Sequence, residues 1–479
     1  MTTEIKRVSA LILIMVLALM TSSTIITAFE ADSLRADDRN VRTLYDSYSA
    51  ERGPILVEGR VIAESVPVDN EFKYLRTYLE PELYAHITGY FTLNQGNTGI
   101  EGELNDYLSG TASDQFLAQL NAILTGQSAK GASVELTIDD NIQRVAAEAL
   151  GANHGSVVAI NPSTGAILAM VSNPSYDPNE LARHNTGLVI AAYNELLDDP
   201  THPLINRAIS GDLYHPGSVF KLVVASAALD SGLLRQDSTV PNPPSLQLPL
   251  SDSIIYNAGR SACGGTDRVT LADALRLSCN IPFAEIGAEI GDDIIREYAE
   301  RFGFGSELGV PMPVTPSIFP PDPDAAQLML ASFGQSDVRV TPLQIAMVTA
   351  AIANGGQLME PTLVDTIRAQ DLSVIEPFHP EVLSTPISAE TAEIMKRLMV
   401  SNVNNGAASN GRINGVDVGG KTGTAQNGEG QPLTLWFTGF APADNPQIAV
   451  AVVVENGSSF GNAVAAPIAR QVMEAVLNR

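Results

Sequence analysis

Two side chains with the chemistry of a nucleophile and its base lie one helical turn apart near the middle of the chain. Ser218 and Lys221 form an SxxK pair in a helix-compatible segment that follows Pro216 and Gly217. Residues three apart share a helix face, and a helix N-terminus offers free N–H groups to an oxyanion. A lysine whose pKa is lowered by burial can take the serine proton. The ordinary alternative is an N-cap serine beside a surface lysine.

Two further groups of polar residues follow along the chain. Ser278 and Asn280 could present a hydroxyl and an amide to one cleft, although a helix C-cap explains this triplet at least as well. The second group is the run Lys421, Thr422, Gly423 and Thr424, just before a strand-like segment. On an edge strand such a run could bind a carboxylate, with the glycine leaving room for a ligand backbone. An ordinary hairpin strand is the alternative.

The order and spacing of the three motifs carry more weight than any one of them. SxxK is followed about 60 residues later by SxN, and about 140 residues further by KTG, as in serine enzymes that open amide bonds. Lysine is scarce, with six residues against 22 arginines, yet two of the six lie in these motifs. A lysine retained in such a chain suggests a role that needs a removable proton.

Other candidate sites are weaker. The sequence from Gly457 to Gly461 matches GxSxG, but a hydrolase of that kind needs a histidine after Ser459, and the last histidine is His379. We therefore predict a turn between a strand and a helix. His215 is predicted to be a loop residue. The histidines and cysteines show no zinc spacing, so we expect no metal and no other cofactor.

The N-terminus predicts a membrane anchor. Val8–Phe29 is an apolar run of 22 residues, preceded by Lys6 and Arg7. It is long enough to span a bilayer, and the positive-inside rule puts residues 1–7 in the cytoplasm and the rest outside. A cleaved signal peptide and a core helix are the alternatives. Outside the cytoplasm Cys263 and Cys279 could form a disulfide around about 15 residues, worth about 3 kcal/mol. Two buried thiols are the alternative.

The chain is long enough for two globular parts. A net charge of −26 makes nucleic acid an unsuitable partner. Residues 30–145 show short strand patterns, with a helix pattern at Gln115–Leu124 and a strand at Val134–Ile138. Residues 146–479 read as an α/β (α+β) domain, a sheet covered by helices. Its expected strands are 156–160, 166–171, 435–440 and 448–455, and its expected helices include 141–150, 218–229, 271–277 and 465–477.

With these motifs the chain resembles the class B penicillin-binding proteins over nearly its whole length. It is most similar to the actinobacterial penicillin-binding protein A group. The resemblance implies a small, mostly β N-terminal pedestal, related to a dimerisation domain, and a penicillin-binding, serine β-lactamase-like domain with a central antiparallel sheet. The supporting segments are Arg52–Ile55, Gly99–Glu101, Ser163–Met170, Gly334–Gln335, Thr341–Gln344, Trp436–Phe437 and the YHPGSVFK run that contains Ser218.

The resemblance also implies a D,D-transpeptidase reaction. Ser218 would attack the D-Ala-D-Ala amide of a peptidoglycan stem peptide, and Lys221 would act as its base. Ser278 would pass the proton to the leaving amine, and Asn280 would hold the substrate amide and Lys221. β-Lactam antibiotics would acylate Ser218.

The remaining implied roles lie on the third motif. Lys421, Thr422 and Thr424 would bind the terminal carboxylate beside Gly423. The backbone N–H groups of Ser218 and Thr424 would form the oxyanion hole. The implied partners are membrane proteins of division or elongation, including a lipid-II polymerase.

Three rival functions can be compared. A β-lactamase or D,D-carboxypeptidase would use the same triplets with water as the acyl acceptor, and the anchor and pedestal disfavour a free β-lactamase. A bifunctional polymerase needs a glycosyltransferase domain, for which about 100 residues are too few. A non-catalytic scaffold or β-lactam sensor would use the pedestal and anchor and would tolerate the loss of Ser218.

Overall fold

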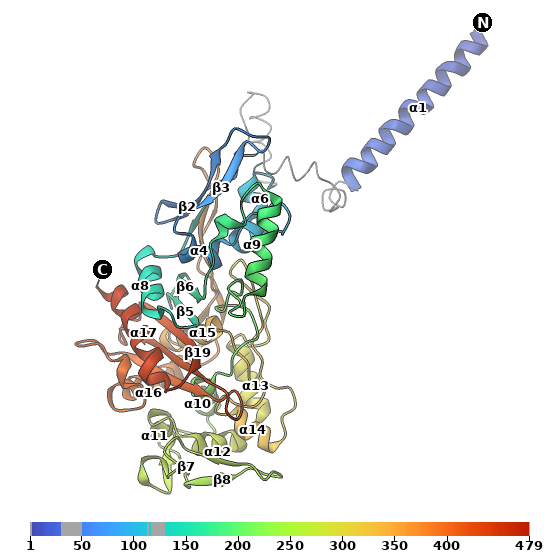
Figure 1. The fold of residues 1–479 in the computed structure, drawn as a ribbon. Coiled ribbons are helices and arrows are strands. Elements are labelled where there is room, and N and C mark those ends of the chain that lie inside the picture. Colours follow the sequence, from blue (N-terminus) through green and yellow to red (C-terminus); the bar gives the residue numbers. More distant parts are fainter. Residues whose placement is uncertain (1, 30–49, 113–114, 116–129, 479) are drawn as a thin grey trace.

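The computed structural model describes residues 2–29, 50–112, 115 and 130–478. An N-terminal helix precedes a body that has a β-rich unit at one end, a five-stranded sheet in the middle and a helical lobe at the other end (Figure 1). The helix expected at Gln115–Leu124 lies outside the described residues except for Gln115.

The first element is a long apolar helix, α1 (Thr2–Phe29). Its segment Ile5–Ile26 has 22 residues with a mean hydropathy of 2.3, and its most apolar part is not buried against the rest of the chain. Within the described ranges it is the one helix long and apolar enough to cross a bilayer. It therefore contains a candidate membrane span where the sequence predicts one.

The N-terminal unit is built on a six-stranded sheet with the order β15-β14-β4-β1-β2-β3. Strands β14 and β15 come from residues 364–377, so the sheet joins segments from both sides of the boundary expected at residue 145. The elements of this unit are β1 (Ile55–Val57), β2 (Arg60–Pro67), β3 (Tyr74–Tyr78), α4 (Pro81–Thr88), α5 (Gly99–Glu103), α6 (Asn105–Ser109), β4 (Ser133–Leu136), β14 (Val364–Arg368) and β15 (Val374–Pro377).

A buried group of three charges lies beside this sheet. Glu101 is fully buried between Arg52 and Arg76. The Arg52 guanidinium donates to Glu101 Oε2 at 2.8 and 3.0 Å and lies 4.0 Å from the centre of the Phe91 ring. Burial alone would raise the pKa of Glu101, but the guanidinium groups of Arg76 and Arg52 outweigh it and lower that pKa. This buried charge group thus connects the segments around Arg52 and Glu101, which are 49 residues apart.

The central sheet has the order β17-β18-β19-β5-β6, and every neighbouring pair is antiparallel. Its strands are β5 (Gly155–Ile160), β6 (Ile167–Asn173), β17 (Gly419–Ala425), β18 (Leu433–Ala441) and β19 (Ile448–Gly457). Alternate residues of β19 enter different cores: Val450, Val452 and Val454 face one, and Ala449, Ala451 and Val453 the other. Because both faces are covered, β19 is almost uniformly apolar.

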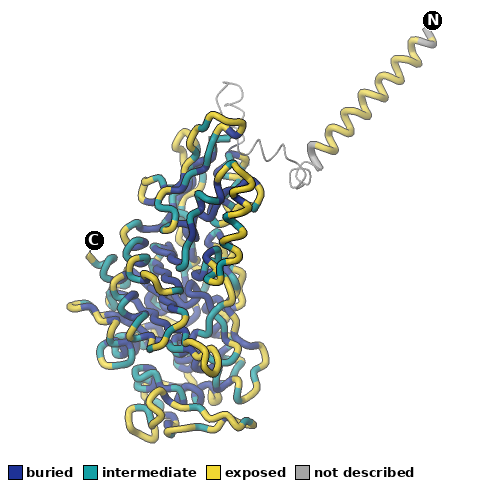
Figure 2. The backbone as a smooth tube through the Cα atoms, in the orientation of Figure 1, coloured by how far each residue is buried: buried dark blue, intermediate teal, exposed yellow. Residues whose placement is uncertain are grey.

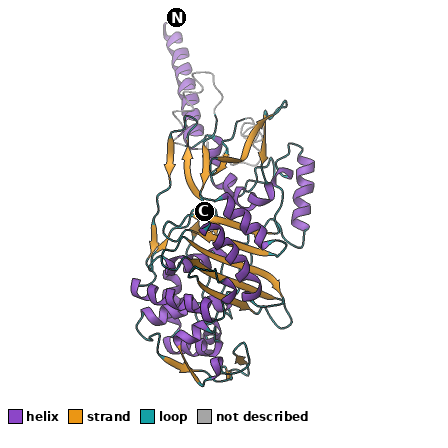
Figure 3. Ribbon diagram, turned by 90° about the vertical axis from the view of Figure 1, so that its left-hand side faces the viewer, coloured by secondary structure: helices purple, strands orange, loops and turns teal. Residues whose placement is uncertain are grey.

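Helices cover both faces of this sheet (Figure 3). One face carries α8 (Asp140–Leu150) and α17 (Gly461–Leu477), and the other carries α15 (Pro342–Ala353). Helix α15 is buried along its whole length, as is most of α10 (Lys221–Asp230), which runs through the interior (Figure 2). The expected antiparallel sheet between helical layers is therefore present.

The remaining elements form the helical lobe and its connections. They are η2 (Pro178–Glu180), α9 (Thr186–Asp198), η3 (Gly217–Val219), β7 (Thr239–Pro241), β8 (Ser245–Gln247), β9 (Ile254–Tyr256), η4 (Cys263–Gly265), β10 (Arg268–Thr270), α11 (Leu271–Arg276), α12 (Asn280–Ile290), α13 (Asp292–Arg301), β11 (Leu308–Gly309), β12 (Pro313–Val314), α14 (Ala325–Ala331), β13 (Leu358–Met359), β16 (Val382–Ser384), α16 (Ala389–Asn405) and η5 (Ser409–Gly411).

Replacing Glu101 by glutamine should destabilise the N-terminal unit by about 3–5 kcal/mol, because two buried guanidinium groups would lose their counter-charge. Urea unfolding of the full chain, with hydrogen exchange over residues 52–110, measures this. Glu103, an exposed residue of the same helix, is the matched control, and Glu103→Gln should change the free energy of unfolding by less than about 0.5 kcal/mol. Equal effects of the two substitutions would contradict the role of the buried charge group.

Candidate active site

Ser218 lies in the short 3-10 helix η3 rather than in the α-helix itself, which begins at Lys221. The sequence expectation of a helix starting at Ser218 is thus three residues early. Gly217 has φ 52°, and a Cβ there would lie 3.1 Å from the Thr424 carbonyl. Its N–H donates to the Gly334 carbonyl at 2.9 Å. This tight turn, which needs glycine, presses the Ser218 backbone against strand β17.

Gly423 lines the cleft, and the packing of the chain also requires a glycine at this position. A Cβ on Gly423 would lie 2.9 Å from the Pro216 carbonyl oxygen and 2.9 Å from Trp436 Cβ. The turn before Ser218 therefore packs directly against the Gly423 backbone. The glycine of the KTG run sets the distance between the strand and the nucleophile turn.

The second motif lies in the turn between α11 and α12. Ser278 has φ 59°, in the left-handed region, and Asn280 is the first residue of α12. Both residues line the same cleft as Ser218. Both interpretations of this triplet agree with the structure: its residues reach a common cleft, and the N–H groups of Ser278 and Cys279 also close the end of α11 by donating to the Leu275 and Ala274 carbonyls at 3.1 and 2.9 Å.

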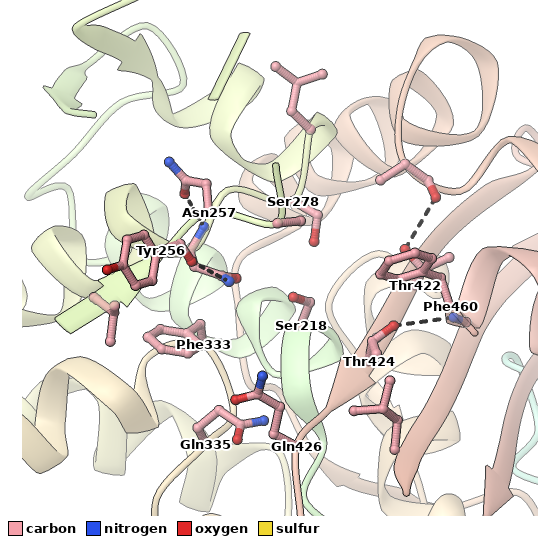
Figure 4. A pocket seen from close by; sticks show the side chains of 18 of the residues that line it. Ser218, Tyr256, Asn257, Ser278, Phe333, Gln335, Thr422, Thr424, Gln426 and Phe460 are labelled. Carbon is pink, nitrogen blue, oxygen red and sulfur yellow. Dashed lines mark hydrogen bonds between the residues drawn. The ribbon is translucent and has the colours of Figure 1, made fainter. Parts of the chain in front are cut away.

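The cleft has a volume of about 740 Å³ and brings the three motifs together. Ser218 lies between Ser278 on one side and Thr424 on the other (Figure 4). Strand β17 forms one wall, and because it is at the edge of the sheet, one side of its backbone is not paired with another strand. An extended peptide could lie along such an edge.

Two fully buried lysines lie behind the cleft surface. Lys221 Nζ donates to the Ser278 carbonyl at 2.9 Å and to Asn280 Oδ1 at 2.8 Å. Lys421 Nζ donates to Ser278 Oγ at 2.7 Å and to the Thr422 carbonyl at 2.8 Å. In the described part of the chain, neither lysine is paired with a carboxylate, and the Ser218 hydroxyl has no hydrogen-bond partner. The two lysines thus meet at Ser278, Lys221 from the start of α10 and Lys421 from strand β17.

The surroundings of these lysines favour their neutral forms. Burial lowers the pKa of Lys221 well below its ordinary value, and the positive charge of Lys421 lowers it further. Burial lowers the pKa of Lys421 to about 7. The rings of Phe283 and Phe333 lie 5.4 and 6.0 Å from Lys221 Nζ and keep water away from it. A neutral amine near neutral pH is what a general base requires.

A buried asparagine that no sequence motif indicated holds the second motif. Asn257 Oδ1 accepts the N–H groups of Asn280 and Ile281 at 2.8 and 3.0 Å, and thus caps α12. Asn257 Nδ2 donates to Asn242 Oδ1 at 3.2 Å. Asn242 in turn bonds the backbone of Cys263. Asparagine in a loop is too common for its spacing to predict such a role.

The disulfide between Cys263 and Cys279 joins the same loop to the residue between Ser278 and Asn280. Their Cα atoms lie 5.8 Å apart, and Cys279 is buried. Together with Asn257 it fixes the wall of the cleft that carries the second motif. Two independent connections therefore hold Ser278 and Asn280 in place.

The weaker candidates occupy supporting positions. The GxSxG stretch is the turn between β19 and α17, as predicted, and the Gly461 N–H donates to Thr424 Oγ1 at 3.2 Å. His215 is a loop residue, also as predicted, and its Nδ1 lies 2.7 Å from an Arg339 guanidinium nitrogen. Thr422 Oγ1 donates to the Ala407 carbonyl at 3.3 Å. Among the residues that the structure describes, no group of three His, Cys, Asp or Glu residues could hold a metal ion.

Comparison with family models decides the family. Residues 155–474 match the model described as the penicillin binding protein transpeptidase domain, and residues 52–134 match the penicillin binding protein A dimerisation domain. The chain belongs to the penicillin-binding transpeptidase family. The resemblance to class B penicillin-binding proteins and the fold class expected from the sequence are thereby confirmed.

Relatives of this penicillin-binding protein are similar along its entire length. It is 40% identical to the peptidoglycan D,D-transpeptidase PbpA of Mycolicibacterium smegmatis over 490 aligned positions, covering 100% of this chain and 99% of the relative. The crystal structure of PBPA from Mycobacterium tuberculosis matches with a TM-score of 0.86 at 40% identity, over 90% of this chain and 100% of that one. An imipenem acyl-enzyme complex of the same protein has a TM-score of 0.87 with the same identity and coverage.

Replacing Asn257 by alanine should destabilise the protein by about 1–3 kcal/mol, since two N–H groups at the start of α12 lose their acceptor. It should also slow acylation by a chromogenic cephalosporin, because Asn280 and Ser278 are no longer held. Asn257→Asp keeps the acceptor oxygen at a helix N-terminus and should recover most of both losses. Thermal unfolding and stopped-flow acylation measure the two effects. An alanine variant that loses stability while keeping its acylation rate would contradict the positioning role.

Proposed function

We propose that this D,D-transpeptidase cross-links peptidoglycan stem peptides through an acyl-enzyme on Ser218. The observation that carries the proposal is the pair of buried lysines that meet at Ser278 behind a cleft lined by Ser218. A serine, an amine of lowered pKa and an unpaired strand edge are the components that acyl transfer from a peptide requires.

In the acylation step, Ser218 Oγ attacks the carbonyl carbon of the D-Ala-D-Ala amide while Lys221 Nζ takes its proton. The N–H groups of Ser218 and Thr424 stabilise the oxyanion, a contribution of about 3–4 kcal/mol for one good donor. The C–N bond then breaks, and the D-alanine amine receives a proton from the Ser278 hydroxyl, which takes back the one proton that Lys221 removed from Ser218. Lys421, which is hydrogen-bonded to Ser278 Oγ, keeps that hydroxyl in place. The serine ester that remains is the acyl-enzyme.

In the second step, an amine of a neighbouring stem peptide attacks this ester. The amine loses a proton to Lys221, the new amide bond forms, and Ser218 Oγ regains its hydrogen as it leaves. Asn280 orients the donor peptide amide and Lys221. Lys421, Thr422 and Thr424 bind the terminal carboxylate before D-alanine departs.

The same proposal covers the position of the protein in the cell. Lys6 and Arg7 precede the candidate span, which favours a single-pass anchor with a cytoplasmic N-terminus and the catalytic part outside. Residues 30–145 would then be the pedestal and residues 146–479 the transpeptidase domain, which the matched ranges 52–134 and 155–474 support. Membrane proteins of division or elongation, including a lipid-II polymerase, are the proposed partners.

Intact mass spectrometry tests the nucleophile directly. The wild-type chain should gain the mass of one benzylpenicillin, and Ser218→Ala should gain none. Ser226→Ala, which removes the hydroxyl of a buried serine two turns along the same helical run, is the control and should be acylated. A mass gain on Ser218→Ala would contradict the assignment. Loss of cellular function in the same variant would separate an enzyme from a scaffold.

The pH dependence of acylation tests the base. The rate should rise with pH as Lys221 loses its proton, with a midpoint well below the ordinary lysine value, because burial and the charge of Lys421 lower the pKa of Lys221. An ordinary lysine would put the midpoint near 10.4. Lys421→Gln removes the charge that lowers the pKa of Lys221, so the midpoint should move to higher pH. A midpoint near pH 10 in the wild type, or a shift to lower pH in the variant, would contradict this base.

A further inference from the structure

The active-site cleft is almost free of charge. Among the described residues that line it, Arg260 is the one charged side chain, and the others offer hydroxyls, amides or apolar groups. This is unusual for a chain whose net charge is −26. An anionic part of a ligand therefore meets a single fixed cation at the cleft surface.

Contacts with its neighbours hold Arg260 in place. Its guanidinium carbon lies 4.7 Å from the centre of the Tyr256 ring, a cation–π contact. Its backbone N–H donates to the Asn257 carbonyl at 2.9 Å, and its φ of 50° turns the chain sharply. The Tyr256 carbonyl accepts a hydrogen bond from Asn280 Nδ2 at 3.1 Å. The position of Arg260 is thus linked to the second motif.

No carboxylate among the described residues neutralises this arginine. In the part of the chain that the structure describes, Arg260 has no ion-pair partner within 4.0 Å, whereas Arg235, another exposed arginine of the same lobe, is paired with Asp237 at 3.2 Å. A guanidinium that is stacked on a ring and unpaired keeps its hydrogen-bond donors for a ligand. Those donors match the two oxygens of a carboxylate.

The two walls of the cleft are expected to contact different parts of the ligand. Under the proposed function, β17 with Lys421 and Thr424 binds the terminal carboxylate of the D-Ala-D-Ala unit. Arg260 belongs to the other wall, with Tyr256 and the second motif. It therefore suits a second anionic group, on a residue of the stem peptide that precedes the D-Ala-D-Ala unit.

We propose that Arg260 binds a carboxylate on the donor stem peptide upstream of the D-Ala-D-Ala unit and so selects donors with a free acid over donors with a carboxamide. The inference rests on the proposed function and adds the substrate class that this site accepts. A cleft without a charge could not make this distinction electrostatically.

The test compares two synthetic thioester donors that differ only in one upstream group, a carboxylate or a carboxamide. Acylation of the detergent-solubilised full chain is followed by thiol release, and the titre of benzylpenicillin-reactive Ser218 gives the amount of active protein. The wild type should prefer the carboxylate donor about tenfold in kcat/KM, the size of one charge-assisted contact at a partly exposed site. The preference should fall as salt is raised.

Arg260→Gln keeps a planar side chain that can lie on Tyr256 and removes the charge, so the preference should fall to about one. Arg235→Ala, which changes the net charge equally outside the cleft, should keep the wild-type ratio. Equal ratios in the wild type and Arg260→Gln would overturn the inference. A preference for the carboxylate donor that appears only when the acceptor amine is present would also overturn the inference. A wild type that takes up no penicillin would overturn the proposed function instead.

Discussion

The active site depends on keeping two lysines buried without a counter-ion. An ammonium group in the protein interior costs several kcal/mol, and a partner carboxylate would offset that cost while raising the lysine pKa. This protein instead gives Lys221 and Lys421 only carbonyl, amide and hydroxyl oxygens within the described residues. Because the unfolded chain binds protons between about pH 7 and pH 10 that the folded chain does not, the lowered pKa values mean that stability falls as the pH is lowered through this window. In the same window the amine is available as a base.

The rest of the fold keeps this arrangement rigid. Lys221 is fully buried at the start of a helix that is buried over most of its length, which keeps the amine out of water. Lys421 lies on a strand whose distance from the nucleophile turn is set by Gly217 and Gly423, because no side chain separates the two backbones. The opposite wall is fixed by Asn257 and by the disulfide at Cys279.

Much of this could be predicted because the chemistry leaves local signals. The spacing of Ser218 and Lys221 reflects one turn of chain, and the apolar run of β19 reflects burial on both faces. The tie from Asn257 to α12 could not be predicted, since it joins segments 23 residues apart through a common residue type. The strands at residues 364–377 also gave no sign that they extend the N-terminal sheet, because strand pairing depends on partners distant in sequence.

Titration of the lysine side chains by NMR tests the central claim most directly. Because the chain has only six lysines, selective ¹³C labelling of the Cε atoms gives few signals, and Lys221→Met and Lys421→Met assign the two of interest. The account predicts that both amines titrate well below 10.4, with Lys421 near 7 and Lys221 responding to the charge of Lys421. Two buried lysines that remain protonated up to pH 10 would contradict it.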